Sequence, residues 1–132
     1  MIGMTDFLRG WRGDRSGATA VEFAFVLPIM ALLIMGIVSL GLLGGVLSNL
    51  HFAVQEAARC SAVNATLCGG PSATVAYARS KFRGGGVAPV FVATGAGCGH
   101  TVTANTTFTL RLAVSTIDIP LSATACYPGK PA

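Results

Sequence analysis

The sequence predicts an α+β protein: a long N-terminal transmembrane helix that continues as a stalk, and a small antiparallel-sheet head outside the membrane. Three observations predict this fold. Residues 23–55 contain no Asp, Glu, Lys or Arg. Beyond residue 86, apolar and polar residues alternate with a period of two, which is typical of strands. All four cysteines follow the apolar run, namely Cys60, Cys68, Cys98 and Cys126.

The composition points to a membrane. The 132 residues are 52% hydrophobic and 11% charged, with a net charge of +4, whereas soluble domains carry about 25% charged residues. This disfavours an ordinary soluble enzyme and excludes a disordered polyelectrolyte. The nine Lys and Arg residues are too scattered to form a nucleic-acid-binding stripe. We therefore expect a lipid bilayer, and no nucleic acid, among the partners.

Residues 23–47 form the predicted span, in which Ser39 is the only strongly polar residue. At 1.5 Å per residue, this run covers about 37 Å, and roughly 20 apolar residues suffice to cross a bilayer. A core helix of a soluble protein is the alternative, but such helices are shorter and are interrupted by polar positions. Pro28 removes the donor to the carbonyl of Ala24, which predicts a kink or a loosened turn.

The flanking charges predict the orientation. Arg9, Arg12 and Arg15 precede the run, and no basic residue follows it until Arg59. The positive-inside rule therefore places the N-terminus in the cytoplasm and the head outside, in a single-pass protein of the cytoplasmic membrane. A secretory signal peptide is disfavoured because the run exceeds the usual h-region of about 7–15 residues and no A-x-A site follows it closely. No lipobox precedes Cys60 either.

A carboxylate stands at the start of the apolar run. Residues 15–23 read Arg-Ser-Gly-Ala-Thr-Ala-Val-Glu-Phe, so Gly17 is followed by four residues, then by Glu22 and Phe23. Glu22 is costly in lipid unless it is paired, although an interfacial residue could reach the headgroups. The pattern resembles the prepilin processing site. Within that class, it is similar to the TadE-like pseudopilins of the tight-adherence (Flp) type IV pilus system, although it does not separate TadE from TadF types.

The resemblance implies how the chain is processed. A prepilin peptidase would cut between Gly17 and Ala18, so that residues 1–17 are a cleaved cytoplasmic leader, 18–62 the transmembrane and stalk helix, and 63–132 a pilin-like head. In such proteins the glutamate, here Glu22, is thought to pair with the terminal amine of a neighbouring subunit, here that of Ala18. Gly41 and Gly45 form a G-x-x-x-G pair that suits close helix packing, although glycine is also simply common in membrane helices.

The resemblance also implies a role. The protein would be a structural minor pilin or pseudopilin, needed for assembly or present at the tip or base of a pilus used in surface adhesion. Its partners would be the prepilin peptidase, other pilins and the pilus assembly platform, and it could enter the extracellular pilus. We expect that the protein is not an enzyme and binds no cofactor. Only three carboxylates remain after cleavage, which does not provide paired-carboxylate acid/base machinery, and no catalytic motif is present. The alternative is an uncleaved bitopic protein whose head acts as a scaffold or binding module in an envelope complex.

The head is expected to contain a short helix and a sheet. We predict that the stalk ends near Ala62, followed by a loop over residues 64–71 and a helix over residues 73–82. Strands are expected around Val87, over 90–92, 101–114 and 121–127, with a turn at residues 116–120. They would make three or four strands packed on the upper stalk. One face of the middle strand carries Val102, Ala104, Thr106, Phe108, Leu110, Leu112 and Val114.

The cysteines are expected to form disulfides, because an even number lies on the oxidising side. Four cysteines allow three pairings, and the sequence alone does not choose among them. We favour Cys60–Cys68, which closes the loop after the stalk, and Cys98–Cys126, which ties the last strand to the sheet. A metal site is disfavoured, since no C-x-x-C pair exists and only His51 and His100 could assist.

Overall fold

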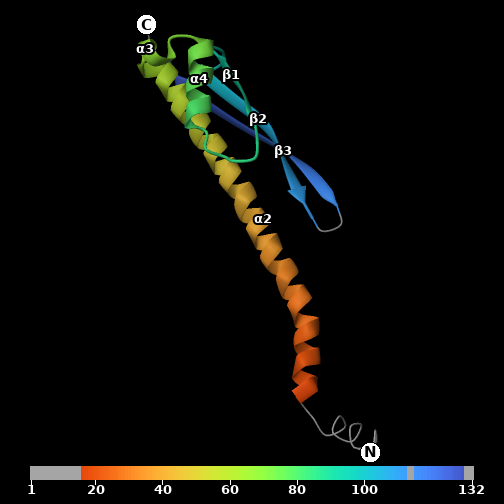
Figure 1. Ribbon diagram of the computed structural model, residues 1–132. Coiled ribbons are helices and arrows are strands. Elements are labelled where there is room, and N and C mark those ends of the chain that lie inside the picture. The colour runs from red at the N-terminus through yellow and green to blue at the C-terminus, as the bar shows by residue number, and fades with distance from the viewer. Residues whose placement is uncertain (1–15, 113–114, 130–132) are drawn as a thin grey trace, which may run out of the picture. The chain divides into compact units, whose positions relative to one another are not determined.

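The protein has an α+β fold, as expected. The computed structural model describes residues 16–112 and 115–129; Arg9, Arg12 and Arg15, and with them most of the predicted leader, lie outside these residues. The elements in chain order are α2 (Ser16–Val63), α3 (Ala65–Cys68), α4 (Pro71–Lys81), β1 (Val90–Thr94), β2 (Gly99–Arg111) and β3 (Thr116–Pro128) (Figure 1). Internal contacts divide the chain into two compact units, Met1–Val38 and Ser39–Ala132.

In the first unit, the described residues belong to α2 alone. This 48-residue helix continues through Pro28 without interruption. Its large apolar side chains up to Leu42 are between 53% and 72% exposed, among them Phe23, Phe25, Leu27, Ile29, Leu33 and Ile37. Such a surface is far more apolar than that of a soluble helix and requires an apolar surrounding.

In the second unit, one face of α2 is buried. Leu50, Ala53, Val54, Ala57 and Ala58 are at most 1% exposed and follow one another at spacings of three, one, three and one, which places them on a single helix face. They form one core with residues of all three strands and of α4, namely Ala78, Phe91, Val102, Ala104, Leu121 and Ala123.

The end of α2 leads into a compact corner rather than the expected open loop. Asn64 caps α3, because its side-chain oxygen accepts hydrogen bonds from the Leu67 backbone N–H (3.1 Å) and from the Thr66 hydroxyl (2.6 Å). The prediction of a loop over residues 64–71 is therefore wrong at α3, whose single helical turn is too short to create a periodic pattern. Pro71 occupies the first turn of α4, where its missing N–H costs nothing.

The three strands form one antiparallel sheet in the order β1-β2-β3. The predicted face of β2 is confirmed: Val102 and Ala104 are buried and Thr106, Phe108 and Leu110 are half-buried. Leu112 lies beyond the end of β2 and is 43% exposed, while Val114 lies outside the described residues. Phe91 of β1 meets Phe82 edge to face, with ring centroids 6.3 Å apart.

Two details of the sheet differ from the prediction. The expected turn at residues 116–120 is wrong, because these residues begin β3, with Thr116 opposite Arg111 and Pro120 opposite Thr107. Pro120 is tolerated because β3 is an edge strand and needs no donor on its outer side. Val87 lies in the loop before β1 rather than in a strand, since Pro89 follows it and cannot donate to a ladder.

Both favoured disulfides are present. Cys60 and Cys68 join the end of α2 to the end of α3 with 5.8 Å between their Cα atoms, and Cys98 joins Cys126 with 6.3 Å between theirs. The first bridge is buried, whereas both cysteines of the second are exposed. Thr74, which is 2% exposed, donates its hydroxyl to the carbonyls of Gly70 (3.0 Å) and Cys68 (3.3 Å) and so fixes α4 against the first bridge.

The two bridges should differ in their response to a reductant. A thiolate must reach a sulfur atom to attack it, so we expect Cys98–Cys126 to be reduced faster than Cys60–Cys68, by on the order of tenfold. Alkylation of released thiols during a dithiothreitol time course, followed by mass spectrometry, measures both rates. A Cys98→Ala/Cys126→Ala variant isolates the slow bridge as the control. Equal rates for the two bridges would contradict this expectation.

Candidate processing site, membrane anchor and head surface

The predicted processing residues lie in the first two turns of α2. Gly17, Ala18, Glu22 and Phe23 are all exposed, and a Cβ added at Gly17 would meet no other atom within 4 Å. The Gly17–Ala18 bond is thus helical and sterically open. Because the first N–H groups of a helix have no intrahelical acceptor, this turn opens more easily than the interior. The bond therefore lies where a protease could draw the backbone into an extended form.

Glu22 and Ala18 share a face of α2. Residues four apart in a helix are neighbours, with roughly 5–6 Å between their Cβ atoms. A carboxylate at position 22 thus projects beside the site where cleavage would release an amino group. Phe23 is 65% exposed on the adjoining surface, so the charge is followed at once by the apolar part of the helix.

The apolar part of α2 has the length and composition to cross a membrane. Gly17–Val63 contains an 18-residue window that meets this test, and none of that window is buried by the protein. A core helix would instead be covered by its own chain. The exposed surface therefore fits a single-pass membrane protein.

The predicted glycine pair lies on an open surface. A Cβ added at Gly41 or Gly45 would meet nothing within 4 Å. The Asn49 side-chain amide donates to the Gly45 carbonyl at 2.8 Å, which places a polar group one turn from the pair. The described residues leave room there for a neighbouring helix.

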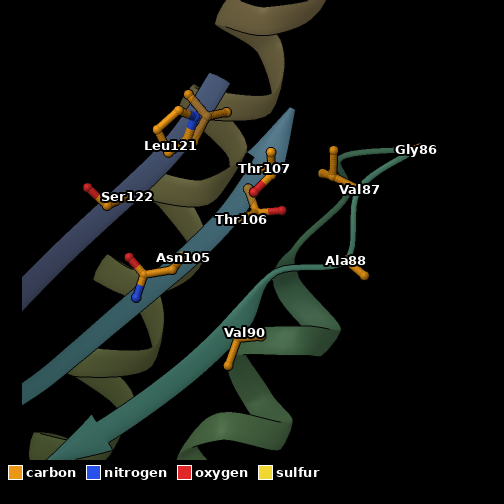
Figure 2. Close-up of a pocket in the computed structure, with 10 residues that line it drawn as sticks. Gly86, Val87, Ala88, Val90, Asn105, Thr106, Thr107, Leu121 and Ser122 are labelled. Atoms are coloured by element: carbon orange, nitrogen blue, oxygen red, sulfur yellow. The ribbon is translucent and has the colours of Figure 1, made fainter. Parts of the chain in front are cut away.

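The head carries a hollow that the sequence did not predict. Its volume is about 800 Å³, and it lies between the loop at Gly86–Ala88 and the strands β2 and β3 (Figure 2). The pairing of β1 with β2 stops at Val90 and Asn105, so Thr106 and Thr107 face the hollow beside an unpaired stretch of β2. Pro89, which directly precedes the first residue of β1, is the one sequence signal for this gap.

The hollow offers hydroxyl, amide and apolar groups. None of its ten lining residues carries an ionisable side chain; they are Gly86, Val87, Ala88, Val90, Asn105, Thr106, Thr107, Pro120, Leu121 and Ser122. Such a lining supports hydrogen bonding and apolar contact rather than proton transfer. Within residues 16–112 and 115–129, no three His, Cys, Asp or Glu side chains gather as a metal site.

Among the described residues, the exposed apolar helix and the small α+β head fit a single-pass membrane protein. Residues 17–59 match the family model described as TadE-like protein. The matched segment begins at the predicted cleavage site and covers about a third of the chain. In this segment the chain is similar to TadE-like proteins. No curated protein and no solved structure matches the chain.

A charge within the exposed run should impair membrane insertion. Arg at the centre of a transmembrane helix costs about 2.5–3.5 kcal/mol on insertion scales. We expect Leu33→Arg to reduce the membrane-integrated fraction, measured as the protein that resists alkaline carbonate extraction. Gln55→Arg, at an exposed position of the same helix beside the head, is the matched control and should integrate normally. Full integration of Leu33→Arg would contradict the assigned span.

Proposed function

We propose that this protein is a minor pilin, or pseudopilin, of a tight-adherence (Flp) pilus, which acts at the tip or base and is needed for assembly and surface adhesion. The match that begins at Gly17 and runs through the exposed apolar helix carries the proposal. A prepilin peptidase removes residues 1–17 on the cytoplasmic side. The mature subunit stays in the cytoplasmic membrane with its head outside until the assembly platform moves it into the filament.

Cleavage creates a partner for Glu22. It converts the Ala18 amide into an α-amino group, which is largely protonated at neutral pH. A carboxylate held in lipid is costly, and a neighbouring ammonium offsets part of that cost. The amine of one subunit and Glu22 of the next therefore set the axial register between adjacent helices. Gly41 and Gly45 add a surface on which helices of other pilins can approach closely.

The first test is the N-terminal sequence of the protein extracted from membranes. We expect it to start at Ala18 when an active prepilin peptidase is present and at Met1 when the peptidase is inactive. Edman degradation or mass spectrometry of the terminal peptide measures this directly. A start at Met1 in both strains would favour the uncleaved bitopic scaffold.

The second test separates assembly from insertion. Glu22→Gln removes the charge but leaves the helix intact, so cleavage and carbonate-resistant insertion should be unchanged. Incorporation into sheared pili, measured by immunoblot, should fall by on the order of tenfold, because an ammonium in lipid would lose its partner.

Glu56→Gln is the matched control, since Glu56 lies on the same helix beside the head. Normal incorporation of Glu22→Gln would remove the proposed pair. A loss in both variants would show that the effect is not specific to position 22.

A further inference from the structure

The apolar ladder between β2 and β3 extends past the protein core. On the helix-facing side of the hairpin, Val102 pairs with Ala125, Ala104 with Ala123, and Phe108 with Ile119, and all of these belong to the core or pack against it. Two rungs farther along, on the same face, Leu110 pairs with Ile117, and Ile117 is 47% exposed. Leu112 follows at 43% exposed.

The end of this hairpin points toward the end of the head at which α2 enters. At the opposite end, Tyr127 and Pro128 line a hollow with Ala62 and Val63, the last residues of α2. Halfway along the hairpin, Phe108 and Ile119 pack against the same core as Leu43 and Leu47. Three rungs beyond them, Arg111 and Thr116 close the ladder, and Figure 1 shows the hairpin projecting away from α3 and α4.

The chain leaves no spacer between the predicted span and the head. About 20 of the 25 residues in the predicted run 23–47 suffice to cross the hydrocarbon core, so a crossing that starts at Phe23 ends near Leu42, which is 60% exposed. Leu43, the next residue, already packs against the core of the head. The predicted crossing therefore ends at the helix residues where the head begins.

We propose that the hairpin end, comprising Leu110, Arg111, Leu112 and Ile117, rests in the outer interface of the bilayer that α2 crosses. This inference relies on the proposed single-pass anchor and adds a second lipid contact to it. The lipid accounts for apolar side chains that the chain itself leaves uncovered. Farther up the hairpin, side chains on the same face, such as Phe108 and Ile119, pack against the core of the head and need no other cover.

The charges at the hairpin end fit a phospholipid surface. Arg111 is exposed, and its long side chain can keep its apolar stem in the interface while the guanidinium binds lipid phosphate. The acidic neighbour Asp118 accepts a hydrogen bond from the Thr109 hydroxyl at 2.7 Å, and this rung lies two rungs farther up the strand pair than that of Arg111. The cation thus lies nearer the end than the anion.

A tryptophan at position 112 tests the contact. In a Trp11→Phe background, which removes the single native tryptophan, Leu112→Trp reports on the hairpin end of the full chain. The protein is reconstituted in vesicles of phosphatidylethanolamine and phosphatidylglycerol with brominated acyl chains. Leu33→Trp reports on the span, and Leu67→Trp, at a 60% exposed position of α3, is the matched control at the other end of the head.

We expect Leu112→Trp and Leu33→Trp to lose emission in proportion to the brominated lipid and Leu67→Trp to keep it. Quenching of Leu33→Trp alone would overturn the hairpin contact while leaving the anchor intact, and would favour a neighbouring subunit as the cover. Quenching of neither would overturn the anchor and the contact together. Equal quenching of Leu112→Trp and Leu67→Trp would also overturn the proposal, because the contact would not be specific to the hairpin end.

Discussion

Backbone hydrogen bonding is the constraint on which the structure depends. Lipid offers no partners to N–H and C=O groups, so a chain that crosses it must satisfy them within the segment. The continuous helix α2 does this except at Pro28, which has no N–H to donate to the Ala24 carbonyl. The same helix then meets a second demand beyond Ser39. There the buried face of α2 includes the small side chains of Ala53, Ala57 and Ala58, which belong to the core of the head. One helix therefore presents a surface suited to lipid at one end and a face that packs in the head at the other.

The head is small, and its hydrophobic core alone provides only modest stability. Domains of this size gain stability from covalent bridges and from saturated polar groups at helix ends. Asn64 caps α3, the single Thr74 O–H is shared between the Gly70 and Cys68 carbonyls, and the Phe82 backbone N–H donates to the Ala78 carbonyl at the end of α4 (3.1 Å). These contacts cluster around the buried bridge between Cys60 and Cys68, so the corner that turns the chain from α2 into α4 is the most heavily fixed part of the head.

Periodicity predicted the elements that are long enough to repeat. The apolar run predicted α2, and alternation predicted the inner face of β2. Periodicity did not predict features that are short or that depend on tertiary context. One helical turn at α3 has no period, and Pro120 indicates a turn unless the strand is known to lie at an edge, which is a tertiary fact.

The candidate site divides in the same way. Gly17, Glu22 and Phe23 form a linear motif that can be read from the chain, whereas the hollow beside β2 and the exposed rung at Ile117 arise only from pairing register. A register cannot be derived from a single strand, because it depends on where its partner begins. Pro89 is consistent with the hollow and the length of β2 with the exposed rung, but neither signal determines these features.

The two disulfides also limit how far the chain can be stretched. If the chain is pulled between α2 and its C-terminus, the force passes from Cys60 directly to Cys68 and from Cys98 directly to Cys126. The segments enclosed by these bridges, which have sequence separations of 8 and 28, cannot lengthen while the bonds hold. The longest strands of the head, β2 and β3, lie almost entirely inside the second loop. Mechanical tension could therefore peel α4 and β1 away while the β2–β3 hairpin stays closed.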